Sequence, residues 1–306
     1  MLTEDIQRRF ADDLLRDEPL AKYTAARMGG PADWLYVARN SIDDLTQLLM
    51  MAWAADIPVR VIGGGANILI SDAGVRGLVI VNKVSEVKFG EWHEGRRASA
   101  TGGTSFAVFA NKCQSHGLTG MEWAVSVPGT VGGAIVNNAG AHGADMADSI
   151  ADVVVLQPDG PKMYTLDDLD YDYRYSALKA RDDRRFLVLL ATFRMELDEP
   201  AAIKARMASF IAHRKQTQPA GASLGSIFKN PPGDYAGRLV EAAGLKGYQI
   251  GTAMVSPVHA NFFINVGKHE AKAADYLALI RHVQGEVEKQ TGHHLELEIE
   301  LIGQWS

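Results

Sequence analysis

The sequence has little of several features that place a protein in a functional class. Its 306 residues include a single cysteine, Cys113, which excludes an intrachain disulfide and a cysteine-based zinc or iron–sulfur site. No apolar run approaches the ~18–20 residues of a membrane-spanning helix. The formal net charge is −6 at pH 7, so the chain lacks the basic excess typical of nucleic-acid-binding proteins.

The remaining composition is that of a globular protein. Hydrophobic residues make up 47% and charged residues 22%, which excludes disordered and fibrous classes. At roughly 150 residues per domain, the length predicts two or three domains. The opening stretch, MLTEDIQRRF, is charged and amphipathic and does not resemble a secretion signal. We therefore expect a cytoplasmic protein with no membrane attachment and no nucleic-acid partner.

Helices and strands are mixed along the chain. Apolar residues recur at helical spacing after Ser41 and near residues 105–116, 203–215, 235–243 and 272–291. Strands are expected near residues 59–62, 68–70, 78–81, 98–101, 150–156, 186–193, 248–255, 261–266 and 295–302. Because crossover helices do not regularly follow the strands, an α+β protein fits better than a doubly wound sheet. A shift in composition at Glu199 and Pro200 predicts a domain boundary near residue 200.

Glycine is in excess, with 30 residues, and it gathers in a few loops. The first such loop, GGGAN at 63–67, directly follows a predicted strand, and its glycines let backbone N–H groups approach an anion closely. The pattern matches neither the dinucleotide-binding G-x-G-x-x-G nor the nucleotide-binding P-loop, and a strand is expected after it. Taken alone, the loop fits a tight hairpin equally well.

A second glycine-rich stretch, VPGTVGGAIVNNAGAHG, occupies residues 127–143. Two backbone-rich loops without lysine suit a ligand with a long pyrophosphate spine, because backbone amides alone can hold its phosphates. The alternative is that these glycines merely pack in crowded turns. The nine histidines form no metal-binding pattern, so no metal is expected.

The glycine blocks PVRVIGGGANILI and GMEWAVSVPGTVGGAIVNNAGAHG resemble the FAD-binding half of the UDP-N-acetylenolpyruvoylglucosamine reductases. Alone they would indicate only the wider vanillyl-alcohol-oxidase-type flavin fold. Further blocks match in order over residues 20–303, namely YTAARMGGPADWL, YDYRYSALK, GSIFKNPPGDYAGRLVEAAGLKGYQIG, VHANFFIN and LELEIELIG. GSIFKNP together with the glutamate-rich end is more specific to the reductases. The short PPGDYAG link resembles the subtype that lacks a long tyrosine-loop insertion.

The resemblance implies a fold and a reaction. The fold would be an α+β, vanillyl-alcohol-oxidase/PCMH-type FAD-binding region with subdomains at 1–85 and 86–200. A C-terminal α+β substrate-binding domain would follow at 201–306, its last strand returning toward the flavin. The reaction would use non-covalent FAD and NADPH to reduce a UDP-sugar enolpyruvyl ether in peptidoglycan precursor synthesis. We further expect a cytoplasmic monomer.

The resemblance also assigns the cofactor to the two glycine loops and the segment after the second. The implied FAD-binding residues are Gly63, Gly64, Gly65, Ala66, Asn67, Pro128, Gly129, Thr130, Gly132, Gly133, Asn138 and Gly140. In this part of the chain two positions depart from the family pattern, because Ala66 stands where serine is common and His142 where tyrosine is frequent. The missing hydroxyl at Ala66 would remove a hydrogen bond worth about 1 kcal/mol and leave the backbone cradle intact.

The implied catalytic residues follow the chemistry of hydride addition. Hydride addition to C3 of the enolpyruvyl group pushes negative charge onto its carboxylate, so a fixed cation there lowers the barrier. Arg174 matches the family arginine for that carboxylate, and its fork can make two bonds. Ser226 matches the proton donor to C2, with Lys229 as a plausible charged neighbour. Substrate binding falls to Tyr173, Lys229 and Asn230.

Three glutamates near the C-terminus leave one assignment open. Glu296, Glu298 and Glu300 alternate with apolar residues, so a regular strand would place all three on one face, by default a solvated one. Counting back from Ile302 and its following glycine, the resemblance selects Glu298 as the catalytic carboxylate. Leu297 stands where the family commonly has proline, and a slip of two residues to Glu296 stays open.

Two other functions compete with the reductase. One is a flavin oxidase of the same fold acting on a hydroxy acid or sugar, which should lack the set Arg174, Ser226 and Glu298. The other is a non-catalytic protein that binds flavin or a UDP-sugar, which measured turnover would exclude.

Overall fold

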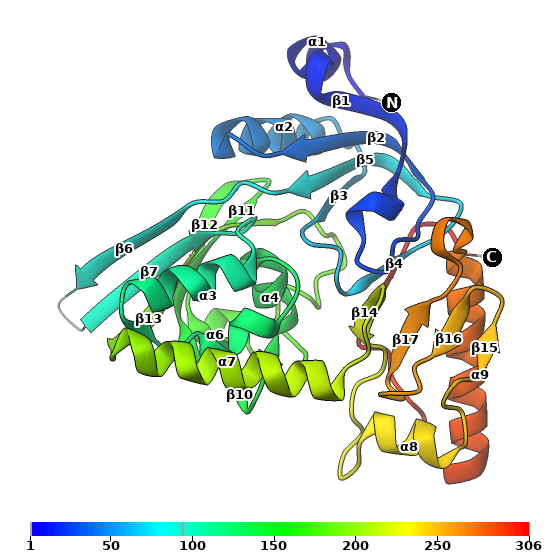
Figure 1. Ribbon diagram of the computed structural model, residues 1–306. Helices are drawn as coiled ribbons and strands as arrows, with labels where there is room; N and C mark the ends of the chain where they lie inside the picture. Colours follow the sequence, from blue (N-terminus) through cyan, green and yellow to red (C-terminus); the bar gives the residue numbers. More distant parts are fainter. Residues whose placement is uncertain (1, 93–94, 306) are drawn as a thin grey trace. The chain divides into compact units, whose positions relative to one another are not determined.

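The computed structural model describes residues 2–92 and 95–305, which form two compact units (Figure 1). Unit 1 comprises Met1–Leu15, Trp34–Gly64 and Gly77–Arg214. Unit 2 comprises Arg16–Asp33, Gly65–Arg76 and Lys215–Ser306. Each unit therefore combines segments that are distant in sequence. The boundaries predicted at 85/86 and 200/201 describe a different division and stay a prediction.

A four-stranded sheet near the N-terminus of the chain has the order β1-β2-β5-β3. Its strands are β1 (Leu14–Pro19), β2 (Pro31–Ala38), β5 (Val75–Asn82) and β3 (Val59–Ile62). Helices α1 (Glu4–Phe10) and α2 (Ile42–Ala54) bury apolar faces with β2 and β5. As its sequence predicts, α2 begins after Ser41, whose hydroxyl accepts the Asp44 N–H at 3.0 Å.

A larger sheet forms the rest of unit 1, in the order β12-β11-β13-β7-β6, with β8 beside β13. Its strands are β6 (Val87–Trp92), β7 (Gly95–Thr101), β8 (Leu118–Thr119), β11 (Ile150–Gln157), β12 (Gly160–Tyr164) and β13 (Leu187–Leu197). The helical elements here are α3 (Phe106–Ser115), the 3₁₀ helix η3 (Glu122–Ser126), α4 (Val131–Asn137), α5 (Met146–Ser149), α6 (Leu166–Leu169) and α7 (Pro200–Thr217). A short hairpin joins β9 (Gly140–Ala141) to β10 (Ala144–Asp145). Apolar side chains of α3, α4 and α7 share one core with β7, β11 and β13.

Unit 2 is built on an antiparallel sheet with the order β14-β17-β16-β15. Its strands are β14 (Ser223–Ser226), β15 (Gln249–Ile250), β16 (Ala253–Val255) and β17 (Phe262–Asn265). Helices α8 (Ala236–Ala242) and α9 (Ala273–Thr291) complete its core. The Asp72 carboxylate accepts the N–H groups of Ala273 and Ala274, both at 2.9 Å, and so caps α9.

The last strand is shorter than the sequence predicts. Only β18 (Glu300–Ile302) is regular, and it pairs in parallel with β4 (Ile68–Ile70). Before it, Leu297 forms an isolated antiparallel bridge with Phe228, and the chain bends at residues 298–299. The predicted strand 295–302 is therefore wrong in its first half, because the segment changes partners midway and alternation does not register such a change.

The single cysteine lies inside the core of unit 1. Cys113 is 1% exposed on α3, and burial, helped by the charge of Glu122, raises the pKa of its thiol to about 12. Only thiolate reacts readily, so we expect no labelling of the folded protein by a disulfide reagent at pH 8. One thiol per chain should react after unfolding in guanidinium, which serves as the control. Rapid labelling of the folded protein would contradict this burial.

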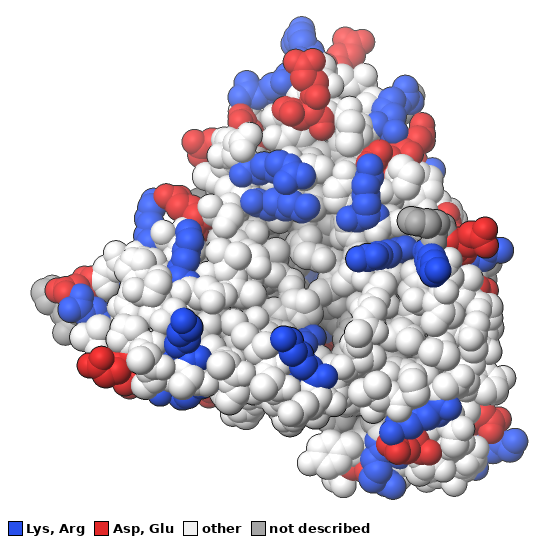
Figure 2. Space-filling model, in the orientation of Figure 1, with Lys and Arg blue, Asp and Glu red and all other residues white. Residues whose placement is uncertain are grey.

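Both signs of charge are present on the surface. On the face drawn in Figure 2, Lys and Arg stand singly or in small groups among uncharged side chains, with Asp and Glu between them. None of the helices in the described part of the chain is long and apolar enough to cross a membrane.

Candidate functional site

The two glycine loops touch each other within unit 1. A Cβ on Gly64 would lie 2.7 Å from the Cα of Gly129, and one on Gly63 would meet the hydroxyl of Thr130. Side chains at Gly63 and Gly64 would therefore push the loops apart. Gly129 adopts φ +116°, a conformation that favours glycine. Glycine is therefore required at Gly63 and Gly64 by the close approach of the two loops, and at Gly129 by its backbone conformation. The backbones of the two loops form one surface where they meet.

Several N–H groups in these loops are available for a ligand. Those of Gly64, Gly65, Ala66, Gly129 and Thr130 make no hydrogen bond to another described residue. Unpaired backbone donors gathered in glycine-rich turns form an anion-binding concavity. By contrast, the Gly132 N–H donates to the Gly102 carbonyl at 2.8 Å, and the Gly133 N–H donates to the Thr130 hydroxyl at 3.4 Å. As flavin contacts, Gly132 and Gly133 stay a prediction.

The second half of the first loop is held inside unit 2. Gly65 has φ +62°, and a Cβ there would collide with the Tyr23 carbonyl. The Gly65 carbonyl accepts the Ala25 N–H at 2.9 Å. The Asn67 side-chain amide donates to the Glu298 carbonyl at 3.2 Å, and the Asn67 carbonyl accepts the Glu300 N–H at 2.9 Å. Asn67 therefore connects the first loop to the glutamates predicted for catalysis.

A further backbone contact within unit 2 connects Glu298 to the segment that carries Ser226. The Glu298 N–H donates at 2.8 Å to the carbonyl of Ile227, the residue after Ser226. Glu298 is thus anchored through both its N–H and its carbonyl. The Ser226 hydroxyl makes no hydrogen bond to another described residue, so this side chain neither stabilises a turn nor caps a helix. This leaves the hydroxyl available for a ligand.

The structure also separates the three glutamates. The bend at residues 298–299 breaks the regular alternation, so the expectation that all three share one face of a strand is wrong. Glu296 is the exposed one, and its carboxylate pairs with the Lys229 ammonium at 3.3 Å. Glu298 is partly buried. The geometry thus gives Glu296 an ion-pair partner and gives Glu298 backbone hydrogen bonds with Ile227 and Asn67.

Arg174 lies in unit 1, in a turn that places it beside the second loop's downstream segment. Its guanidinium donates to the carbonyls of Gly140 at 3.0 Å and Asn138 at 3.4 Å. Its backbone is left-handed at φ +55°, uncommon outside glycine, and Lys179 donates to its carbonyl at 3.1 Å. The guanidinium also lies 5.5 Å from the centre of the Tyr173 ring. These contacts fix the direction of the cation.

Comparison with known proteins connects this geometry to a family. An FAD-binding domain model matches residues 35–162, and a model of the UDP-N-acetylenolpyruvoylglucosamine reductase C-terminal domain matches residues 216–302. The reductase of Agathobacter rectalis is 42% identical over 304 residues, covering 95% of each chain. That of Geobacter metallireducens is 39% identical over 302 residues, covering 98% of this chain and 97% of the relative.

The chain belongs to the UDP-N-acetylenolpyruvoylglucosamine reductase family. The crystal structure of the reductase from Thermus caldophilus is similar to it, with 32% identity and a TM-score of 0.76 over 95% of this chain and 98% of that one. The predicted family and fold class, an α+β protein with a PCMH-type FAD-binding region, are confirmed. As a member of this reductase family, the chain is a flavoprotein oxidoreductase, with FAD as cofactor and NADPH as hydride donor.

The residues of this reductase fit FAD. Within unit 1, the close-packed glycines and the unpaired N–H groups of Gly64, Gly129 and Thr130 form a backbone cradle that suits a pyrophosphate. Asn138 adds a second indication, since it is 3% exposed and its Oδ1 has no hydrogen-bond partner among the described residues. A buried acceptor without a partner costs free energy unless a ligand donor completes it. No group of three or more His, Cys, Asp or Glu in the described part of the chain could hold a metal.

The predicted substrate-binding residues have structural partners too. Asn230 accepts the Ala236 N–H at 3.1 Å through its Oδ1, which helps α8 to begin. Lys229, expected beside Ser226, forms its ion pair with Glu296. Tyr173 is 48% exposed, as a residue that contacts a ligand must be. Their roles toward the substrate stay predictions.

Sequence analysis missed Glu122. It is 7% exposed at the start of η3, directly before the second glycine loop. Burial raises the pKa of Glu122, but hydrogen bonds from Thr119, Arg206 and the Gly120 N–H outweigh burial and leave the pKa below its ordinary value. A signal was present, because Glu122 is the one charged residue in the stretch GMEWAVSVPGTVGGA.

Proposed function

We propose that this chain reduces UDP-N-acetylglucosamine enolpyruvate to UDP-N-acetylmuramate, a step of peptidoglycan precursor synthesis. The single observation that supports this most strongly is the anchoring of Glu298 between Asn67 and Ile227, the residue that follows Ser226. A flavin oxidase would not need a proton donor and a carboxylate at that place. We further propose that the enzyme works in the cytoplasm as a monomer.

The cofactor would rest on the backbone cradle of the two glycine loops. Bound FAD supplies the hydride chemistry, accepting a hydride from NADPH and delivering one to C3 of the enolpyruvyl group. Gly64, Gly129 and Thr130 of unit 1 would donate their N–H groups to the pyrophosphate, and Gly65 and Ala66 stay predicted FAD contacts. No lysine is required, since backbone dipoles that are fixed in advance stabilise the phosphates without reorganising.

Arg174 would bind the carboxylate of the enolpyruvyl group. Hydride addition at C3 moves negative charge toward that carboxylate, so a guanidinium held in place lowers the energy of the enolate-like intermediate. The bonds to the Asn138 and Gly140 carbonyls fix the guanidinium before substrate arrives. A guanidinium suits a carboxylate because it is a planar fork that never loses its charge.

Ser226 would deliver a proton to C2 of the intermediate, and Glu298 would orient or relay that proton. A serine hydroxyl is a weak acid, so it needs a neighbour that replaces the proton it gives away. The hydrogen bond that joins the Glu298 N–H to the residue after Ser226 supports this role. A protonated Glu298 could act directly as the source.

The proposed function predicts two separate colour changes. The purified protein should be yellow, and NADPH should bleach its flavin absorbance in the absence of oxygen. Adding the enolpyruvyl UDP-sugar should restore the absorbance with formation of one product molecule per flavin. A hydroxy acid, which a flavin oxidase would use as its reductant, should not bleach the oxidised flavin. If oxygen restores the colour rapidly while the UDP-sugar does not, the oxidase reading is correct and this proposal is wrong.

The cradle predicts that a side chain at Gly64 expels the cofactor. Gly64→Val should weaken FAD binding at least about 10-fold, because the new Cβ would lie 2.7 Å from the Gly129 Cα and force the loops apart. Gly129→Val should do the same through backbone strain at φ +116°. Gly285→Val is the matched control, since a Cβ at Gly285 meets nothing within 4 Å. Flavin content of folded protein is the measurement, and full occupancy in both loop variants would refute the cradle.

A further inference from the structure

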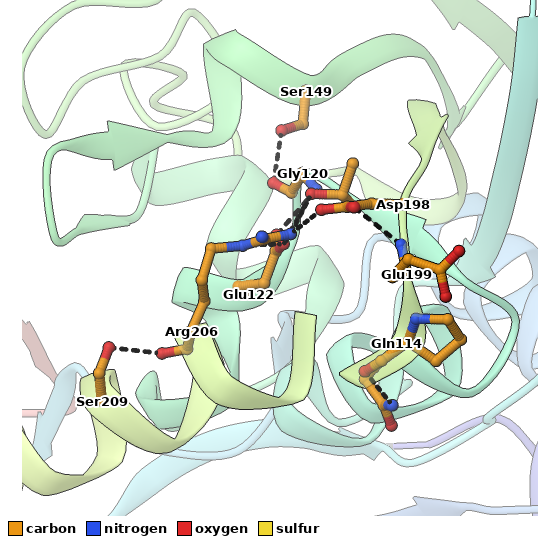
Figure 3. A network of polar contacts seen from close by, with 10 residues as sticks. Gln114, Gly120, Glu122, Ser149, Asp198, Glu199, Arg206 and Ser209 are labelled. Carbon is orange, nitrogen blue, oxygen red and sulfur yellow. Dashed lines mark hydrogen bonds and ion pairs between the residues drawn. The ribbon is translucent and has the colours of Figure 1, made fainter. Parts of the chain in front are cut away.

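A cluster of polar residues lies directly upstream of the second glycine loop. We define the Glu122 cluster as Thr119, Gly120, Glu122, Asp198 and Arg206, all in unit 1 (Figure 3). In this view the Arg206 side chain extends from α7 to Glu122 and Asp198. The cluster therefore ties α7 to the segment that leads into the loop.

The Glu122 carboxylate is fully engaged. Its Oε1 accepts the Thr119 hydroxyl at 2.6 Å and two Arg206 N–H groups, from Nε at 3.0 Å and Nη2 at 2.7 Å. Its Oε2 accepts the Gly120 N–H at 2.8 Å. Arg206 also donates to Asp198 at 2.6 Å. Only the Glu122 carboxylate of this pair is buried, so removing Arg206 leaves the Glu122 charge without its cation, which is costly.

The far end of the same short helix is held by the same face of α7. Arg206, Phe210 and Arg214 lie four residues apart on α7, so they share one face. Arg214 donates to the Ser126 carbonyl at the end of η3. Phe210 stacks on His142 with ring centres 4.3 Å apart. Both ends of η3, Glu122 and Ser126, are thus fixed to one helix.

Two contacts connect η3 to the second glycine loop. Trp123, next to Glu122, packs edge-on against Phe106 with ring centres 5.2 Å apart. The Phe106 N–H donates to the Gly129 carbonyl at 3.1 Å. A Cβ on Gly64 would lie 2.7 Å from the Gly129 Cα, so the backbones of the two loops already lie close together at Gly129. A displacement of η3 would therefore be felt at the N–H groups of Gly129 and Thr130.

We propose that Glu122 and Arg206 are positioning residues for the cofactor, holding the second glycine loop in the conformation that binds the FAD pyrophosphate. The inference rests on the proposed flavin cradle and adds two residues that touch no part of it. Binding sites lose affinity when their supporting residues allow shifts of about 0.5 Å. The pair would thus set the affinity for FAD without contacting it.

The test measures FAD release from the holoprotein on dilution, followed by the fluorescence of the freed flavin. Arg206→Gln should raise the FAD dissociation constant about 10-fold, because it leaves the Glu122 charge buried without its cation. Arg206→Lys, which keeps the charge but not the fork, should recover part of the affinity. Glu122→Gln combined with Arg206→Gln should weaken binding no more than Arg206→Gln alone, since both changes remove the same pair.

Arg185→Gln is the matched control. Arg185 pairs with Asp56 at 2.8 Å in the same unit, and its side chain is 42% exposed against 41% for Arg206. It should leave the dissociation constant unchanged. A merely structural role would lower the amount of folded holoprotein but not the midpoint of release, so a shifted midpoint supports positioning. An unshifted midpoint for Arg206→Gln, or an equal shift for Arg185→Gln, would overturn it.

The same assay separates this inference from the cradle itself. If Gly129→Val releases FAD readily while Arg206→Gln does not, the cradle stands and the positioning role is wrong. If Gly129→Val also binds FAD as the unaltered protein does, the second loop is not the flavin site and the positioning role falls with it.

Discussion

Replacing Glu298 by glutamine should lower kcat by about 10²-fold or more while the protein keeps its FAD. The backbone anchors of Glu298, its N–H to Ile227 and its carbonyl to Asn67, are independent of the side chain. The substitution therefore removes the carboxyl group and its proton without moving the segment. Steady-state rates with NADPH and the enolpyruvyl UDP-sugar, alongside the flavin content, give the measurement.

Two neighbouring glutamates are the controls for this prediction. Glu300→Gln should leave kcat near normal and change stability by less than about 0.5 kcal/mol. Glu296→Gln breaks the ion pair with Lys229, so it should alter KM for the UDP-sugar more than kcat. If Glu296→Gln were the inactive variant and Glu298→Gln turned over normally, the catalytic carboxylate would be Glu296.

Regular elements were predictable wherever local signals agree with the tertiary environment. The strand 59–62 and the helix after Ser41 lie where apolar spacing and a capping side chain place them. Gly117 and Gly244, with φ +65° and +73°, directly follow the ends of α3 and α8. In such segments the same residues that favour the element also bury its apolar face, so the pattern alone carries the information.

The conformation of the C-terminal segment and the free or bonded state of the loop N–H groups depend on residues that are distant in sequence. Local sequence patterns do not reveal which distant residues these are. Glu298 lies at the bend between the Leu297 bridge to Phe228 and the pairing of β18 with β4. No periodicity records such a change of partner. Likewise, the glycine content predicts both loops, but only the structure shows that the Gly132 N–H donates a hydrogen bond to the Gly102 carbonyl.

The Glu122 cluster shows a third limit of sequence reasoning. Its members come from three places in the chain, near residues 120, 198 and 206, and each has an ordinary role as a solvated charge or a turn residue. Their role becomes visible only when the fold brings them together around the buried Glu122 carboxylate. The resemblance to the reductases draws attention to residues that meet the ligand, and supporting residues stay hidden until the fold brings them together.

Replacing Ser226 by alanine should separate the two halves of the reaction. Flavin reduction by NADPH needs no proton at substrate C2, so its rate should stay within about twofold of the unaltered protein. Reoxidation by the enolpyruvyl UDP-sugar should slow by about 10²-fold or more, because the proton donor is gone. The two phases can be followed by flavin absorbance after rapid anaerobic mixing.

Ser223→Ala is the matched control for Ser226→Ala, since both serines lie on β14. It should leave both phases unchanged. The Ser226 hydroxyl has no hydrogen-bond partner among the residues that the structure describes, so its removal leaves no internal donor or acceptor unpaired. A slow reoxidation phase therefore cannot come from a damaged fold, and the reduction phase checks this within the same sample. Equal slowing of both phases would show that Ser226 supports the site without donating the proton, and the donor would then have to be Glu298.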